Sequence, residues 1–124
     1  MWSFTTDKPV YVQIIDEIMN RIAVGVYKPG ERIPSVRDLA EEARVNPNTM
    51  QKALAEIERS GYIVSLRTSG KFVTDDLKLI QGLDMVRTDK VTESFLRELS
   101  RLGVAAEDAS AIVEDYVRRM KNDN

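Results

Sequence analysis

The sequence predicts a mainly α-helical fold that carries one small β-hairpin. Two short helices with clear start signals lie only a few residues apart, and two extended segments joined by a glycine turn follow them directly. This order is that of a helix-turn-helix followed by a hairpin, or wing. From residue 77 onward, the apolar residues form two further helical stripes. We therefore expect a winged helix-turn-helix domain at residues 1–76 and a short helical region at residues 77–124.

The composition of the 124 residues is that of an ordinary globular protein, with 43% apolar and 31% charged residues. The absence of cysteine and histidine excludes a disulfide framework, a Ser-His-Asp triad and a Cys-His pair, and it argues against a zinc site. No apolar run approaches the ~20 residues that cross a membrane, and the first ten residues lack the apolar core of a signal peptide. We expect a cytoplasmic protein, and nothing in the sequence suggests a metal site.

Residues 9–24 predict the first helix, because apolar residues recur at positions 10, 14, 18 and 22, with 11, 15 and 19 beside them. Pro9 suits the first turn of this helix. Pro29 and Gly30 suit the central positions of a type II turn, in which glycine supplies the positive φ. We expect residues 31–33 to form a short strand after this turn.

Capping residues mark the starts of the next two helices. Ser35 is a suitable N-cap, and Asp38 three positions later is an acidic residue in the first turn. This second helix is short and is expected to stop near Arg44. Pro47 suits only the first turn of a helix, where its missing N–H is not needed, and Asn46 before it can cap that helix. The third helix therefore has a definite start.

The third helix has an apolar and a polar face. The residues expected to be buried are Met50, Ala53, Leu54 and Ile57. The opposite face carries Asn48, Gln51, Lys52 and Ala55, with Asn46 and Thr49 near the start. Asn and Gln pair with adenine edges, and Lys reaches guanine or phosphate. For an isolated helix, a solvated face with a good cap would be the better interpretation. Between a short capped helix and a hairpin, contact with DNA bases is favoured.

Arg37 and the hairpin turn supply further candidates. Arg37 lies off the apolar face of the second helix, and from spacing alone a DNA contact and an ion pair with Glu41 are equally good interpretations. The turn places two cations around a glycine, which suits a wing that contacts the minor groove or phosphates. Its residues are Arg67, Thr68, Ser69, Gly70 and Lys71. Most hairpin tips are simply solvated, and this turn lacks the upstream glycine of a P-loop.

The formal net charge is −2, but a DNA-binding protein needs a basic face and not a basic whole. Several cations fall in or beside the expected DNA-binding face: Lys28, Arg32, Arg37, Arg44, Lys52, Arg67 and Lys71. Glu41 and Glu42 are close enough to weaken this face. We expect modest non-specific affinity and a steep dependence on salt.

The region from residue 77 is too short to form a large core of its own. Its first segment is apolar and interrupted by Gly82, and two amphipathic helices separated by Gly103 follow. Their apolar stripes contain Val91, Phe95, Leu99 and Leu102 in one helix, and Ala109, Ile112, Val113, Tyr116 and Met120 in the other. The stripes either fold back on the first domain, as a helical cap on a monomer, or meet a second chain. We favour a two-fold dimer formed by Phe95, Leu99, Leu102, Ile112, Val113, Tyr116 and Met120, because its symmetry would match a palindromic site.

Three segments together resemble the GntR family of bacterial transcription regulators: "PVYVQIIDEI", "GVYKPGERIPSVRDLAEEARVNPNTMQKALAEIERSGYI" and "GKFV". The resemblance covers residues 9–74 almost without gaps. The "VNPNT" segment and the short helical tail are most similar to its YtrA subfamily. In that subfamily a winged helix-turn-helix precedes a small helical dimerisation region, so the resemblance implies DNA binding by the first domain and dimerisation by the second.

The resemblance also implies roles for individual residues. Arg37 matches the arginine of the family's P-S-x-R motif, a DNA contact, and this favours DNA over Glu41 as its partner. Family contacts in the first turns of the third helix fall on Asn46, Asn48, Thr49 and Gln51, and the wing glycine falls on Gly70. Two departures leave the target sequence open. Thr68 stands where many relatives have a glycine, and Pro47 or Gln51 stands where several have an arginine.

These observations predict a sequence-specific DNA-binding transcriptional regulator, a repressor that binds a palindromic operator as a homodimer. The expected DNA-binding residues are Ser35, Arg37, Arg44, Asn46, Asn48, Thr49, Gln51, Lys52, Arg67, Ser69, Gly70 and Lys71. The alternative is a winged helix used for protein–protein contact without specific DNA binding. An enzyme is not expected, since no pair of carboxylates has a catalytic motif spacing. The sequence identifies no cofactor, and a small-molecule effector stays open.

Overall fold

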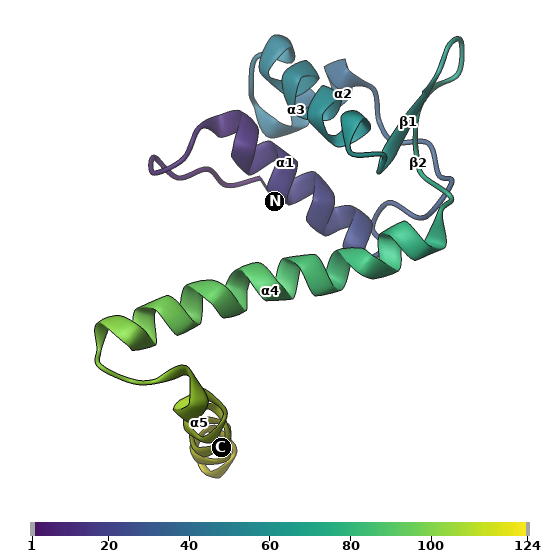
Figure 1. Ribbon diagram of the computed structural model, residues 1–124. Helices are drawn as coiled ribbons and strands as arrows, with labels where there is room; N and C mark the ends of the chain where they lie inside the picture. Colours follow the sequence, from purple (N-terminus) through teal and green to yellow (C-terminus); the bar gives the residue numbers. More distant parts are fainter. Residues whose placement is uncertain (1, 124) are drawn as a thin grey trace. The chain divides into compact units, whose positions relative to one another are not determined.

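A computed structural model describes residues 2–123 and confirms a mainly helical protein with a two-stranded antiparallel hairpin (Figure 1). The elements in order are α1 (Val10–Ala23), α2 (Val36–Ala43), α3 (Pro47–Arg59), β1 (Ile63–Leu66), β2 (Gly70–Val73), α4 (Leu77–Arg101), the 3₁₀ turn η1 (Ala106–Asp108) and α5 (Ala109–Asn122). The chain forms two compact units, of which the first ends at Asp84 and the second begins at Met85. None of the helices in the described range is long and apolar enough to cross a membrane.

The helix starts follow from local capping chemistry, as the sequence predicts. The Ser35 hydroxyl accepts a hydrogen bond from the Asp38 N–H at 3.1 Å and begins α2. The side-chain oxygen of Asn46 accepts a hydrogen bond from the Asn48 N–H at 2.8 Å, and Pro47 is the first residue of α3. Each cap satisfies a backbone donor that would otherwise lack a helical partner, which typically contributes about 1 kcal/mol to stability.

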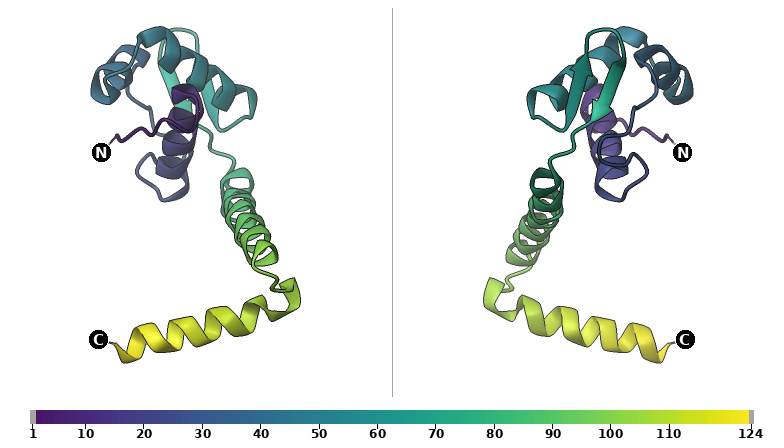
Figure 2. Two further views of the ribbon diagram at one scale, coloured as in Figure 1. Left: turned by 90° about the vertical axis from the view of Figure 1, so that its left-hand side faces the viewer. Right: turned by 90° about the vertical axis from the view of Figure 1, so that its right-hand side faces the viewer.

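The core of the first unit is formed mainly by buried residues of α1, α2, α3 and the hairpin, elements that lie together in both views of Figure 2. Its largest fully buried side chains are Ile14, Ile18, Ile22, Leu39, Met50, Leu54, Ile57, Ile63 and Val73. All four residues expected to form the apolar face of α3 are buried. Burying each large aliphatic side chain is worth about 1.5–3 kcal/mol, so this apolar face fixes which side of α3 meets the core and which side meets solvent.

The hairpin has a register in which Ile63 pairs with Val73 and Leu66 pairs with Gly70. The strand expected at residues 31–33 is reduced to a single bridge, between Arg32 and Phe72. Backbone hydrogen bonds flank this bridge, for example from the Ile33 N–H to the Lys71 carbonyl at 2.9 Å. The strand ends here because the chain enters α2 directly afterwards, with Ser35 as its N-cap.

The second unit consists of the later part of α4, the turn at Gly103 and α5. The two expected amphipathic helices are present, and α4 continues through Gly82 without a break. Within the described part of this unit, the buried apolar residues are Leu99 and Ala109. Most of its other large apolar side chains remain exposed, so this unit contains little hydrophobic core of its own.

Candidate nucleic-acid interface

The N-terminal half of α3 presents a polar surface to solvent. Asn46, Asn48 and Gln51 are exposed, and Thr49 is half-buried. The side chains of Asn48 and Gln51 form no hydrogen bond with any other described residue. The Asn46 oxygen accepts the helix-cap hydrogen bond, and its amide NH₂ remains free to donate to an outside acceptor. The capped start therefore leaves two complete amides and one amide donor at the surface of the first two turns.

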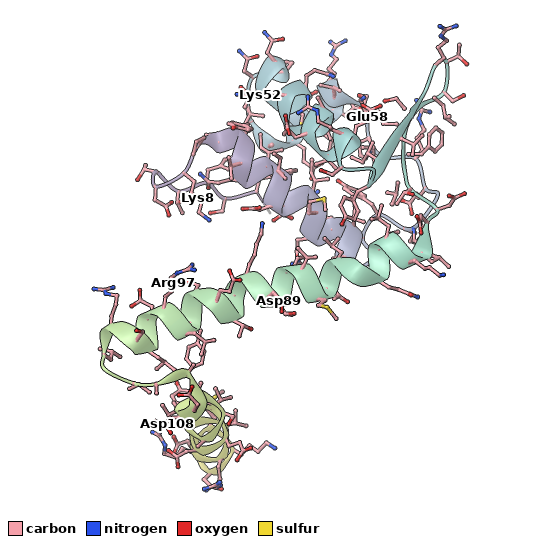
Figure 3. All side chains as sticks on the ribbon, in the orientation of Figure 1. Lys8, Lys52, Glu58, Asp89, Arg97 and Asp108 are labelled. Carbon is pink, nitrogen blue, oxygen red and sulfur yellow. The ribbon has the colours of Figure 1, made fainter. Side chains whose placement is uncertain are left out.

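Lys52 lies on the same exposed face, and its side chain contacts Tyr11 of α1. Its ammonium is 3.9 Å from the centre of the Tyr11 ring, within the range of a cation–π interaction. Figure 3 labels Lys52 on α3. Such a contact at an exposed site is worth about 0.5–1 kcal/mol. The contact leaves the charge unpaired and fixes its position at the junction of α1 and α3.

Two arginines lie at opposite ends of α2, one in its first turn and one at its C-cap. Arg37, in the first turn of α2, is exposed and forms no ion pair with any described residue, so the alternative pairing with Glu41 is not formed. Arg44 closes α2 with φ = 58°, the left-handed conformation, and is the sole non-glycine residue with positive φ in the described range. Arg44 is also exposed and free of ion pairs there. Both guanidinium groups are available to an anionic partner.

The wing differs from expectation at Lys71. Arg67 and Ser69 are exposed at the turn, but the Lys71 side chain is only 19% exposed. Its ammonium lies 3.3 Å from a Glu58 carboxylate oxygen and donates a hydrogen bond to the Ser65 hydroxyl at 2.8 Å. Successive strand residues point to opposite faces, and Lys71 lies on the face that carries the buried pair Ile63 and Val73. Lys71 therefore stabilises the core-facing side of the hairpin, and its charge is already paired with Glu58.

The acidic residues near this surface are partly neutralised. Arg21 of α1 binds the Glu17 carboxylate at 2.8 Å, the Glu42 carboxylate at 3.2 Å and the Tyr27 hydroxyl at 3.0 Å. Burial opposes the charged form of Arg21, but these hydrogen bonds outweigh it and raise the pKa of the guanidinium above its ordinary value. Of the two carboxylates expected to weaken the basic face, Glu42 is thus balanced by Arg21, while Glu41 stays exposed.

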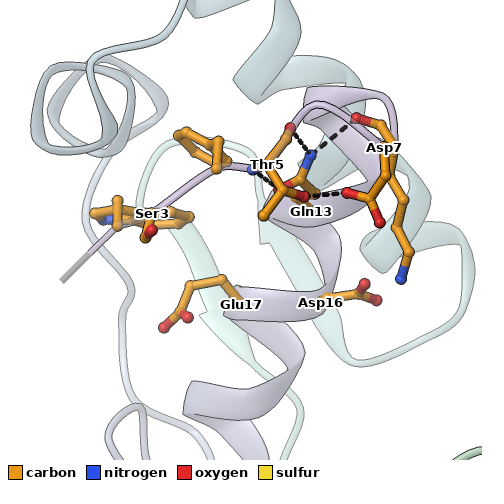
Figure 4. A pocket seen from close by; sticks show the side chains of 9 residues that line it. Ser3, Thr5, Asp7, Gln13, Asp16 and Glu17 are labelled. Atoms are coloured by element: carbon orange, nitrogen blue, oxygen red, sulfur yellow. Dashed lines mark hydrogen bonds between the residues drawn. The ribbon is translucent and has the colours of Figure 1, made fainter.

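A separate hollow of about 300 Å³ lies between the N-terminal segment and α1 (Figure 4). The Thr5 N–H donates to the Gln13 side-chain oxygen at 2.8 Å, and the Gln13 amide donates to the Thr5 carbonyl at 2.9 Å. The carboxylates of Asp7, Asp16 and Glu17 also line it, which makes the hollow unsuited to phosphate. No group of three or more acidic residues in residues 2–123 has the arrangement of a metal site.

The expected dimerisation residues fall into two groups. Leu102, Ile112, Val113, Tyr116 and Met120 are exposed, and Phe95 is half-buried. Leu99 is only 8% exposed, so the chain itself already covers it. Phe95 and four α5 residues line an apolar hollow of about 300 Å³; these are Ile112, Val113, Tyr116 and Val117. Sequence analysis missed Val117, although it lies four residues after Val113, on the same side of the helix.

Comparison with known proteins gives the family. Residues 10–73 match the model of the gntR family of bacterial regulatory proteins. The chain is 35% identical over 105 residues to the uncharacterized HTH-type transcriptional regulator YhcF of Bacillus subtilis (strain 168), a match that covers 85% of this chain and 87% of that protein. It is 42% identical over 76 residues to the HTH-type transcriptional repressor YtrA of the same organism, which covers 60% of this chain and 58% of that protein.

Solved structures agree with this assignment. A GntR family transcriptional regulator from Listeria monocytogenes superposes with a TM-score of 0.83 at 38% identity, over 90% of this chain and 98% of that one. The structure of AraR(DBD) in complex with an operator matches 60% of this chain and 95% of that one, with a TM-score of 0.56 and 26% identity. The chain therefore belongs to the gntR family of bacterial regulatory proteins, close to the YtrA-like members, and is a DNA-binding transcriptional regulator and not an enzyme.

Proposed function

We propose that this protein is a homodimeric repressor that recognises a palindromic operator through α3 and the residues around it. One observation carries the proposal: α3 begins with exposed amide groups, and the preceding helix α2 carries two exposed arginines, Arg37 and Arg44, that have no acidic partner among the described residues. A surface of this kind combines base-specific hydrogen-bonding groups with phosphate-binding cations. The family relationship supports DNA as the partner over a protein–protein module.

The residues divide by chemistry into two roles. Base edges are contacted by Asn46, Asn48, Thr49, Gln51 and Arg37, whose amide, hydroxyl and guanidinium groups discriminate among bases in the major groove. Phosphates are contacted by Ser35, Arg44, Lys52, Arg67, Ser69 and the backbone at Gly70. The Ser35 oxygen accepts the Asp38 N–H, and its hydroxyl proton remains free to donate to a phosphate. Lys71 supports the wing and is not assigned a phosphate.

A homodimer is supported by the exposed apolar surface of the second unit. Leu99 and Ala109 are the buried apolar residues in its described part, whereas Val113, Tyr116 and Met120 are between 45% and 57% exposed. Such a surface is costly to leave in water, and a second copy with the same surface would cover it across a two-fold axis. We accordingly assign residues 1–76 to DNA binding and residues 77–124 to dimerisation. The two-fold axis would relate two copies of α3, as a palindromic operator requires.

Repression and a cytoplasmic location complete the proposal. The relative YtrA is named a repressor, and a repressor acts by occupying its operator. A cytoplasmic location is part of the proposal because a bacterial regulator must reach DNA inside the cell.

The test is selection of bound duplexes from a random DNA library with the full-length protein at moderate salt. We expect enrichment of a palindrome whose half-sites are about one helical turn apart. Sedimentation of the protein with the selected duplex should give two chains per duplex. A folded protein that enriches no sequence would refute specific DNA recognition. Enrichment of a single half-site, bound by one chain, would refute the dimer and leave the recognition surface in place.

A further inference from the structure

The guanidinium of Arg32 lies directly against Gly70, the first residue after the wing turn. A Cβ atom added at Gly70 would lie 2.9 Å from the Arg32 Nε, 3.2 Å from a terminal guanidinium nitrogen and 3.4 Å from Cζ. Gly70 also has φ = +101°, a backbone conformation that side chains disfavour. The guanidinium of Arg32 thus occupies the space that a side chain at position 70 would need, and a residue with a Cβ would displace it.

The strand pairing explains this contact. Arg32 bridges to Phe72, and directly opposed residues in an antiparallel pair share one face of the sheet. Gly70 is two residues before Phe72, so it lies on that same face next to Arg32. The Arg32 side chain therefore runs along the hairpin towards its turn, over the position where a side chain is missing. Lys71 lies on the opposite face, where it pairs with Glu58.

The Arg32 charge is uncompensated within the described residues. Arg32 is exposed, and no ion pair joins it to another described group. Glu31 and Asp38 line the same surface hollow as Arg32, but neither carboxylate is within ion-pair distance of it. The Glu31 carboxylate instead accepts a hydrogen bond from the Lys28 N–H at 3.2 Å. The wing therefore carries two available cations, Arg67 from its own turn and Arg32 from a segment more than thirty residues earlier.

We propose that Arg32, seated on Gly70, is the second cation of the wing and binds a phosphate of the DNA backbone. This inference rests on the proposed function, since it needs DNA beside the wing. A guanidinium offers paired N–H donors in one plane, which suits a phosphate. Because Arg32 is exposed and forms no ion pair with a described residue, its guanidinium is available to a phosphate beside the wing. In this account the glycine at position 70 serves to place Arg32, in addition to shaping the turn.

The experiment measures the affinity of the full-length protein for its selected duplex and for a scrambled duplex, from 50 to 200 mM salt. The variants are Arg32→Gln, Gly70→Ala and the two combined, with Lys78→Gln as the control. Lys78 is an exposed cation in the first turn of α4, so the control removes one charge without touching the wing. Thermal unfolding of each variant reports whether the domain is intact.

Loss of one phosphate contact lowers the slope of log affinity against log salt by about 0.9. Raising the salt fourfold should weaken DNA binding by both proteins. The weakening should be about 3.5-fold smaller for Arg32→Gln than for the wild type, and this should hold for both duplexes. Gly70→Ala should reduce the salt slope by a similar amount. The double variant should have nearly the same slope as either single variant, because both substitutions remove the same phosphate contact. Lys78→Gln should keep the wild-type slope.

An unchanged slope and affinity in Arg32→Gln, with tight wild-type binding, would overturn the inference alone. Wild-type protein that prefers no duplex would overturn the proposed function. If Gly70→Ala unfolds the domain, the Arg32→Gln comparison still decides the question.

Discussion

The Lys71 ammonium lies 3.3 Å from a carboxylate oxygen of Glu58, and this ion pair ties the second strand of the wing to the last turns of α3. Figure 3 labels Glu58 on the side of α3 that faces the hairpin. The Ser65 hydroxyl, on the first strand, accepts a hydrogen bond from the same ammonium at 2.8 Å. One cation thus connects both strands of the wing to the helix that presents the proposed base contacts, so the wing and α3 should keep a fixed relative position.

Replacing Lys71 with methionine should leave the salt dependence of DNA binding unchanged, because its charge is already used inside the protein. The contrast is Arg67→Gln at the exposed turn, which should lower the slope of log affinity against log salt by about 0.9. Fluorescence anisotropy with a labelled duplex at several salt concentrations measures both. A reduced slope in Lys71→Met would mean that DNA displaces Glu58 and recruits this lysine.

The ion pair also predicts a pH dependence of stability. The hydrogen bond with Ser65 and the contact with Lys71 lower the pKa of Glu58 below its ordinary value of 4.5, against the opposing effect of burial. Because the folded-state pKa is depressed, the stabilisation is fully present above pH 4.5 and is lost as the pH falls through the lower folded value. Glu58→Gln should therefore unfold more readily than the wild type at pH 7, and the difference should shrink in acid.

Urea unfolding at a series of pH values measures this difference. For a partly exposed pair we expect a cost of at most about 1 kcal/mol at pH 7. Glu56→Gln is the matched control, since Glu56 pairs with the exposed Arg59 on the same helix. A difference between Glu58→Gln and wild type that stays constant down to pH 3 would show that the carboxylate charge is not the cause.

Asn46 has two separable roles in this structure. Asn46→Asp retains a capping oxygen, so the free energy of unfolding should change little, yet it replaces the amide donor with a negative charge and should weaken operator binding. Asn46→Ala removes the cap and should cost about 1 kcal/mol of stability as well. Chemical denaturation and operator affinity, measured on both variants, separate the roles. Full operator affinity in Asn46→Asp would exclude contact between this side chain and DNA.

Arg37→Ala should weaken binding to the selected operator by about 1–3 kcal/mol if the guanidinium contacts a base, with a smaller loss on scrambled DNA. The side chain forms no ion pair with a described residue, so its removal should leave the folded domain undisturbed. Arg59→Ala removes an arginine from the far end of α3 and serves as the control. Equal losses on both duplexes would reassign Arg37 to a phosphate.

Val113→Glu should convert the proposed dimer into a monomer, because it places a charge in the apolar hollow beside Phe95 and Tyr116. Ala111→Glu is the matched control: it adds the same carboxylate to α5 at an exposed position away from the apolar stripe. Sedimentation velocity over a concentration series reports the mass of each variant. A Val113→Glu protein that sediments like the wild type would place the interface elsewhere.

The starts of α2 and α3 and the face that α3 buries are determined by the sequence alone, because the causes are local. Ser35 and Asn46 lie within three residues of the groups they cap, Pro47 restricts its own backbone, and the apolar spacing of α3 selects Met50, Ala53, Leu54 and Ile57 for the core. The exposed polar face of α3 follows by elimination. These signals are sufficient to predict the order of elements and the region of the proposed base contacts. The start of α4 and its continuation through Gly82 were not predicted.

The tertiary structure decides which charged side chains lack an ion-pair partner and which apolar side chains stay exposed. The sequence predicts that Lys71 is an available cation of the wing, but on the core-facing side of the hairpin it pairs with Glu58. On the opposite face, the guanidinium of Arg32 lies against Gly70. Leu99 shares a helical stripe with Phe95, yet the chain itself already covers it. These outcomes depend on strand register and on contacts between residues far apart in the chain. Spacing along one helix or strand does not encode them, because each partner is supplied by a different element.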